Sequence, residues 1–207
     1  MNFRVAKIND SFALAKMHKI CGEYQKDGFM HKLGVLFLYN YYRVSLKEKH
    51  SVILIADDSN GMPIGFISGT LDAKEHQVQL KRNTISLGIS AFIAILRNPF
   101  LLQELYKRKK SLGSKASKFI VDSGARGEYW AWLPKSKNTM GSGILRQAWI
   151  NVLGELGCKS FRYELDLGNS SFEKYEKIFG CTLIEEIILP DGRKRIIVEQ
   201  NIKKRKI

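Results

Sequence analysis

The sequence predicts an α/β fold in which helices flank a central mixed β-sheet. Its 207 residues suit one hydrophobic core. Apolar patterns follow one another as strand, helix, helix, strand, strand at the start, and as strand, helix, strand, helix, strand, strand after residue 126. Strands that alternate with helices favour parallel pairing, whereas a terminal hairpin adds antiparallel pairs. We therefore expect one domain over residues 1–207, with a mixed sheet.

The first third of the chain predicts two helices and a β-hairpin. A short alternating strand is followed by Asn9 and Asp10, which are good helix N-caps. The later pair of strands flanks an Asn60-Gly61 turn, which is typical of a hairpin. The predicted strands are residues 2–8, 51–58 and 64–72, and the predicted helices are residues 11–25 and 30–48.

Residues 73–123 interrupt this pattern with a sequence of helical composition. We interpret the segment as an insertion of two helices that are separated at Asn98-Pro99. The apolar run Ile85 to Leu96 has 12 residues, too few to span a bilayer. The run either packs on the domain, where it would cover a substrate cleft, or lies in a membrane interface between its flanking basic residues, as a peripheral contact.

The last 80 residues return to alternating strands and helices. Pro190 to Arg193 join the final two strands as a turn. The predicted strands are residues 127–133, 160–167, 181–189 and 194–202, and the predicted helices are residues 142–156 and 170–179.

Composition narrows the classes of partner. The net charge of +14 favours anionic partners. Two basic runs, residues 107–110 and 203–206, supply part of it and are typical of solvated surfaces. No helix-turn-helix, zinc-finger or RNA-binding signature accompanies them, so no specific nucleic-acid partner is predicted. The N-terminus lacks the pattern of a signal peptide, which predicts a cytoplasmic protein. A monomer and a homodimer are both compatible with the sequence.

Cysteine and histidine spacing predicts no metal site. The three cysteines, Cys21, Cys158 and Cys181, contain no CxxC pair, and the four histidines contain no HxH or HxxxH pair. The cysteines are therefore expected to be reduced and mostly buried.

The segment Trp130 to Trp149 contains the pattern with the clearest chemical use. An aromatic strand ends in a bend, and a helix begins at Gly141-Ser142-Gly143. The first N–H groups of a helix point outward with the positive end of its dipole, and glycines allow a phosphate to approach the backbone. Lys135 and Lys137 add positive charge. An ordinary helix start would show the same glycines, so the pattern alone leaves both interpretations open.

Together with its surroundings, this segment resembles the GNAT family of acetyl-CoA-dependent N-acyltransferases. The order of strand, glycine-containing bend, helix, strand, Asn169, short helix and Gly180 matches the family, and "YELDLGNSSFEKYEKIFGC" is similar to its fifth strand and fourth helix. The resemblance extends over nearly the whole chain. It implies a sheet whose fourth and fifth strands splay apart, with acetyl-CoA as the acyl donor and no metal.

The resemblance also implies where acetyl-CoA contacts the chain. The pantetheine arm would pair with the fourth strand, the pyrophosphate would lie on the amides before the next helix, and the start of the following helix would also contact the cofactor. The implied contacts are Ala131, Trp132, Leu133, Lys137, Asn138, Thr139, Met140, Gly141, Ser142, Gly143, Asn169 and Phe172.

The phosphate loop departs from the family motif, which is Arg or Gln, two residues, Gly, one residue, and Gly or Ala. When Gly141 and Gly143 are matched to the glycines, Asn138 occupies the Arg or Gln position. A second register places Thr139 and Gly141 at the glycine positions. Both registers keep the amides of residues 140–143 near the pyrophosphate.

N-acetyl transfer needs a base for the amine and an acid for the leaving thiolate. Many GNAT enzymes use a Tyr on the fourth helix as the acid, which points to Tyr175, although the usual spacing falls on Glu176. An aromatic that packs on the sheet is the alternative role of Tyr175.

For the base we favour Glu128, a carboxylate among aromatic side chains on the splayed strand. The two-residue period places it on the same strand face as Trp130 and Trp132. Glu164 and Asp166 on the next strand are alternatives, and His31 is a candidate auxiliary base.

The leading hypothesis is an acetyl-CoA-dependent N-acetyltransferase that acts on a primary amine of a small molecule. The helical insertion is similar to that of GNAT-like proteins among bacterial surface-polysaccharide enzymes, which suggests an amino sugar. The positive charge is consistent with an anionic acceptor. The alternatives are a catalytically silent CoA-binding domain and a basic protein that binds nucleic acid nonspecifically.

Overall fold

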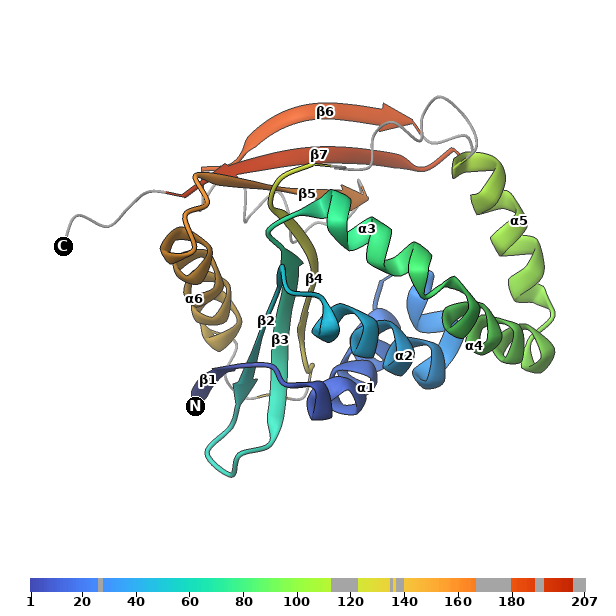
Figure 1. Ribbon diagram of the computed structural model, residues 1–207, viewed down its shortest axis with the longest axis horizontal. Coiled ribbons are helices and arrows are strands. Elements are labelled where there is room, and N and C mark those ends of the chain that lie inside the picture. The colour runs from blue at the N-terminus through green and yellow to red at the C-terminus, as the bar shows by residue number, and fades with distance from the viewer. Residues whose placement is uncertain are drawn as a thin grey trace.

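The computed structural model describes residues 1–25, 28–112, 123–134, 136, 140–166, 180–188 and 192–202. In these parts the chain forms a seven-stranded sheet flanked by six α-helices (Figure 1). The strands are β1 (Asn2–Val5), β2 (Ser51–Asp57), β3 (Pro63–Thr70), β4 (Arg126–Trp132), β5 (Ser160–Asp166), β6 (Thr182–Ile188) and β7 (Lys194–Asn201). The helices are α1 (Ser11–Gly22), α2 (Gly34–Lys47), α3 (Ala73–Arg82), α4 (Thr84–Arg97), α5 (Phe100–Leu112) and α6 (Met140–Glu155), with one-turn 3₁₀ helices η1 (Ile8–Asp10) and η2 (Met30–Leu33).

The sheet is mixed, as predicted, with strand order β1-β2-β3-β4-β5-β7-β6. Five of the six neighbouring pairs are antiparallel, and β4 with β5 is parallel. The predicted hairpin is β2–β3, and Gly61 in its turn has φ +75°. The helix predicted over residues 170–179 lies outside the described residues.

Helices cover both faces of the sheet, which creates two apolar cores (Figure 1). On one face, α1 and α2 pack on β2, β3 and β4 around Tyr42 and Phe66. On the other face, α6 packs around Trp149, whose indole N–H donates to the carbonyl of Val52 (2.9 Å). A Cβ atom at Gly69 of β3 would lie 2.4 Å from the Trp149 ring, so this packing requires glycine there.

The segment between β3 and β4 forms three helices in its described residues, not the predicted two. Asp72 caps α3 by accepting from the amides of Lys74 and Glu75, and the chain turns at Asn83 into α4. Asn98-Pro99 separates α4 from α5, as predicted. The break at Asn83 was missed because residues 73–97 contain no proline, and Asn alone is a weak helix terminator.

A buried histidine in the α1–α2 core makes stability dependent on pH. His18 is hydrogen-bonded to the Tyr42 hydroxyl (2.7 Å) and stacks on Tyr129 with ring centroids 3.6 Å apart. Burial, and to a lesser extent the positive charge of His31, lower the pKa of His18 from 6.5 to about 3. The unfolded chain therefore binds a proton that the folded chain excludes between these pH values.

We expect acid to destabilise the fold through His18. The stabilisation is fully present above pH 6.5 and is lost as the pH falls toward 3, by about 2 kcal/mol at pH 5. Urea unfolding at pH 7 and pH 5 measures it. His18→Phe keeps an aromatic ring and removes the titration, so its free energy of unfolding should depend less on pH. An equal loss in both proteins would assign the acid sensitivity to other groups.

Candidate functional site

The strands β4 and β5 separate just after they meet. Arg126 and Arg162 are the one register pair that joins them in the described parts of both strands, and the amide of Arg162 donates to the carbonyl of Ala125 (3.0 Å). On its other edge β4 stays paired with β3 up to Trp132. Residues 127–132 therefore have one edge of main-chain groups without a strand partner among the described residues.

The predicted pantetheine contacts lie at the end of this splayed strand. Ala131 is buried in the α1–α2 core. The amide of Leu133 donates to the carbonyl of Ile64 (2.9 Å), so the chain is held against β3 beyond the end of β4. The carbonyl of Trp132 accepts from the thiol of Cys21 (3.4 Å), which brings α1 to the same edge. Leu133 is thus bonded to β3 and the Trp132 carbonyl to α1, and the contact of the three residues with a cofactor stays a prediction.

The two glycines at the start of α6 have different surroundings. A Cβ atom at Gly141 would lie 2.7 Å from the Trp132 ring and 2.8 Å from the sulfur of Met1, so close packing on β4 explains this glycine. A Cβ atom at Gly143 would have no heavy atom within 4 Å. Packing therefore does not require glycine at position 143.

The structure corrects the predicted orientation of Glu128. A β-bulge lies opposite Ser68 and Gly69, which pair with Tyr129 and Gly127, so Glu128 has no partner in the β3–β4 register. The extra residue reverses the alternation of side chains. Glu128 thus lies beside His76 on the α1–α2 face, whereas Trp130 and Trp132 pack with the α6 core on the opposite face. The prediction of one shared face was wrong.

The bulge places Glu128 in a chain of buried ionisable groups. Nδ1 of His76 lies 3.0 Å from the carboxylate of Glu48, and its Nε2 lies 3.8 Å from Oε1 of Glu128. Nε of Arg126 lies 3.3 Å from the same Glu128 oxygen. The side chains of Glu48, His76 and Glu128 are 2%, 6% and 15% exposed, so the cluster is shielded from bulk water.

The chain of charges continues onto β5 and β7. Arg126 lies 3.8 Å from Glu164, which also receives a hydrogen bond from Arg195 (3.0 Å). Glu164, an alternative base in the sequence, thus lies between two guanidinium groups. The side chain of Asp166 lies outside the described residues.

A small cavity separates Glu128 from its neighbours. Its volume is about 10 Å³, the space of roughly one water molecule, and the lining includes Tyr41, Tyr42, Ser68, His76 and Glu128. Oε1 of Glu128 and Nε2 of His76 are buried and have no hydrogen-bond partner among the described residues. Burial, and then the charge of Glu128, raise the pKa of Tyr41. The site therefore provides a carboxylate and an imidazole nitrogen that a water molecule or an amine proton would satisfy.

Sequence patterns did not identify His76 or Glu48. His76 is in the first insertion helix, and Glu48 follows the last turn of α2. Glu48 also accepts from the hydroxyl of Thr70 (3.5 Å) and the amide of His50 (3.2 Å). The one available signal was that His76 lies one turn after Asp72, a strong N-cap. This position gives no information about which residue His76 contacts elsewhere in the fold.

Several predicted site residues are not placed. Lys137, Asn138, Thr139, Asn169, Phe172 and Tyr175 lie outside the described residues. Both the glycine register of the phosphate loop and the acid role of Tyr175 therefore remain predictions. His31 is buried against Gly22, where a Cβ atom would lie 2.4 Å from its own, and burial together with Lys19 and Lys32 lowers its pKa. The role of His31 as an auxiliary base stays a prediction.

In the described parts of the chain, no three His, Cys, Asp or Glu side chains gather in a way that would hold a metal ion. In the same parts, no helix is both long enough and apolar enough to cross a bilayer.

The arrangement of strands and helices is that of GNAT acetyltransferases. An N-acetyltransferase from Staphylococcus aureus Mu50 is similar with a TM-score of 0.60 at 11% identity, covering 98% of each chain. A ribosomal-protein-alanine N-acetyltransferase from Brucella melitensis gives 0.60 at 10% identity, over 97% of this chain and 99% of that one. An acetyltransferase of the GNAT family from Bacillus cereus ATCC 10987 gives 0.52 at 12% identity, over 98% of each chain.

No protein-family model and no curated protein sequence matches the chain. At 10–12% identity the structural matches define the fold alone. The chain therefore has the GNAT acetyltransferase fold over nearly its whole length, and the activity must be argued from the site.

Proposed function

We propose that this protein is an acetyl-CoA-dependent N-acetyltransferase that acts on a primary amine of a small molecule. The observation that carries the proposal is the splay of β4 from β5, because α6 begins near the end of the same strand. Main-chain groups on a strand edge suit the amides of a pantetheine arm, and helix N-terminal amides suit a pyrophosphate. Gly141 of α6 packs on Trp132 of β4, so these two kinds of group lie at the same end of the strand.

Residues of the chain itself would hold the acyl donor. Ala131, Trp132 and Leu133 would bind the pantetheine arm, and the amides of residues 140–143 would bind the pyrophosphate, with Lys137, Asn138 and Thr139 before them. Gly143 fits this role because nothing in the structure fills the space where its side chain would be. Bound acetyl-CoA supplies the activated acetyl thioester.

Glu128 is the group that we assign as the general base. Its carboxylate accepts a proton from the ammonium or amine of the acceptor, directly or through a water molecule in the small cavity. The nitrogen lone pair then forms the C–N bond as the C–S bond breaks, and the thiolate takes up a proton from an acid, for which Tyr175 is the candidate. We assign His76 and Glu48 as positioning residues, because Nε2 of His76 lies 3.8 Å from Oε1 of Glu128 while its Nδ1 is held by Glu48 (3.0 Å).

The chemistry of the acceptor follows from charge. With a net charge of +14, an anionic small molecule such as an amino sugar carrying a phosphate is favoured over a polyamine, which the protein would repel. A cytoplasmic location follows from the need for acetyl-CoA, and we propose it on that ground.

Thermal shift with acetyl-CoA, CoA and a DNA duplex tests the proposal first. Both CoA and acetyl-CoA should raise the melting temperature at micromolar to millimolar concentrations. Thiol release from acetyl-CoA in the presence of a panel of amines, including phosphorylated amino sugars, then measures transfer. Stabilisation by DNA alone would instead indicate a nucleic-acid-binding protein, and cofactor binding without amine-dependent thiol release would indicate a silent CoA-binding domain.

A further inference from the structure

The outer face of α4 is apolar and exposed. Ile85, Ile89, Phe92 and Leu96 follow each other at intervals of four, three and four residues, which places them in one stripe along the helix. Their exposed fractions are 80%, 58%, 59% and 66%. Four large apolar side chains in one row are more than the scattered exposed residues of an ordinary surface, so the stripe indicates a surface that something covers.

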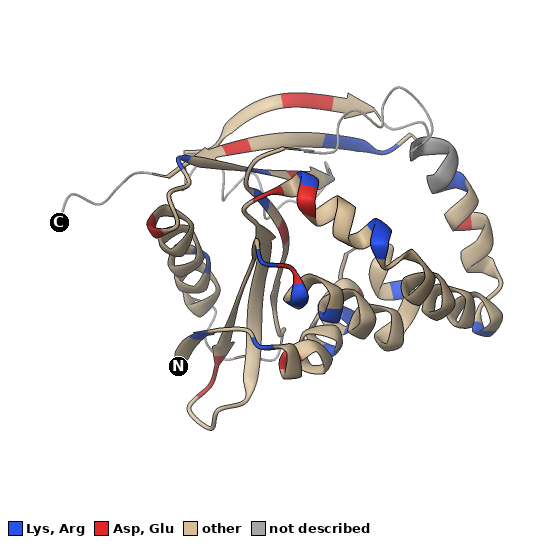
Figure 2. Ribbon diagram, viewed as in Figure 1, with Lys and Arg blue, Asp and Glu red and all other residues tan. Residues whose placement is uncertain are grey.

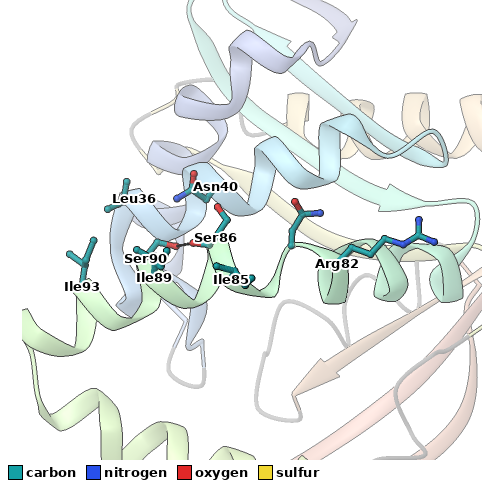
Figure 3. Close-up of a pocket in the computed structure, with 9 residues that line it drawn as sticks. Leu36, Asn40, Arg82, Ile85, Ser86, Ile89, Ser90 and Ile93 are labelled. Atoms are coloured by element: carbon teal, nitrogen blue, oxygen red, sulfur yellow. Dashed lines mark hydrogen bonds between the residues drawn. The ribbon is translucent and has the colours of Figure 1, made fainter.

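The rest of α4 already has its partners within the fold. Its opposite side packs on α2 and buries Ser90, whose hydroxyl donates to the carbonyl of Leu87 (2.9 Å). Ile85 and Ile89 of the stripe also line a groove of about 520 Å³ between α2 and α4, and Figure 3 shows Leu36 facing Ile89 and Ile93 across it. The helix is therefore apolar well beyond the side that packs on α2.

Positive charge surrounds this surface. Lys81 and Arg82 precede α4 and are exposed, and Arg82 lies 3.8 Å from Glu75. Arg97 ends α4, and Lys107 is exposed on α5. Residues 81–107 contain one acidic residue, Glu104, and it is paired with Lys32 (3.0 Å). In Figure 2, α4 itself is almost free of charge, with basic residues toward its ends. An apolar stripe between basic residues is the pattern of a helix that lies in a membrane interface.

We infer that α4 docks on an anionic lipid surface, with the stripe among the acyl chains and the basic residues against the headgroups. Its 14 residues extend about 21 Å, which is less than the thickness of the hydrocarbon core, so the helix would lie along the bilayer surface. A second copy would bury the same stripe, but it would bring two chains of net charge +14 and the same basic rim together. An anionic lipid surface would cover the stripe with acyl chains and pair the basic residues with headgroups.

Cosedimentation of the full chain with vesicles tests this inference. We expect binding to vesicles of phosphatidylcholine with 30% phosphatidylglycerol that is at least roughly tenfold tighter than to phosphatidylcholine alone and that weakens as salt is added. Phe92→Asp should weaken this binding roughly tenfold or more, since it places a charge in the acyl region. The double variant Lys81→Gln/Arg82→Gln should weaken it about fivefold per cation removed.

The matched control is Met62→Asp, which adds the same charge at another exposed apolar residue, in the β2–β3 turn, and should bind like the unmodified chain. Equal melting temperatures of the three variants establish that they are folded. Unchanged binding of Phe92→Asp, or equal binding to both kinds of vesicle, overturns the inference. A dimer in sedimentation velocity that Phe92→Asp dissociates, without vesicle binding, also overturns it and assigns the stripe to a second copy. None of these readouts depends on acetyl transfer.

Discussion

Glu128→Gln is expected to lower kcat for amine-dependent thiol release by about 10²-fold or more, while acetyl-CoA still stabilises the protein. Gln has nearly the same shape as Glu but cannot accept the amine proton. It also removes the negative charge that lies 3.3 Å from Arg126 and 3.8 Å from His76. Steady-state kinetics with the best amine of the panel, together with a thermal shift, measure both effects.

A matched carboxylate variant separates a base from a merely structural carboxylate. Glu199→Gln is the matched control, because Glu199 is a carboxylate of the same sheet that pairs with Arg162 (3.3 Å), away from the cavity. A variant Glu128→Gln that retains full kcat would remove Glu128 as the base.

His76→Gln tests the positioning role. Because His76 lies 3.8 Å from Glu128 and is assigned a positioning role, its loss should lower kcat less than Glu128→Gln does and leave the KM for the amine nearly unchanged.

Gly143→Glu should weaken binding of CoA by on the order of tenfold to a hundredfold and leave the fold intact. The new side chain meets no heavy atom within 4 Å of its Cβ, so packing is undisturbed. Its carboxylate would stand at the helix N-terminus, where the pyrophosphate is expected, and like charges at that distance repel strongly even in a partly solvated site. Isothermal titration with CoA measures the affinity, and thermal unfolding checks the fold.

Two controls isolate the charge and its position. Gly143→Gln adds similar bulk without charge and should lose less affinity. Asn151→Asp adds the same charge on the exposed side of α6, about 12 Å further along the helix, and should leave CoA binding nearly unchanged. If Gly143→Glu binds CoA as tightly as the unmodified chain, the pyrophosphate lies elsewhere. Gly141 is unsuitable for this test, because any side chain there collides with Trp132.

Local patterns predicted most of the elements correctly. The hairpin of β2 and β3, the separation of α4 from α5 at Asn98-Pro99, the mixed sheet and the strand–helix order around α6 are all present in the structure. Each depends on residues that are neighbours in sequence, since periodicity, caps and turn residues act within one or two turns of chain. The resemblance to the GNAT fold was confirmed for the same reason, because it was based on the order of these elements.

The sequence by itself thus determined most of the helices and strands, while the phosphate-binding turn stays a prediction. Only the tertiary structure decided which side chains meet. A bulge opposite Ser68 and Gly69 turned Glu128 away from Trp130 and toward His76, and the insertion brought His76 to Glu48 across the core. Likewise, only the structure showed that packing on Trp132 requires glycine at position 141 and that packing does not require it at position 143. These contacts depend on register and packing between segments that are distant in sequence, and a pattern along the sequence does not reveal them.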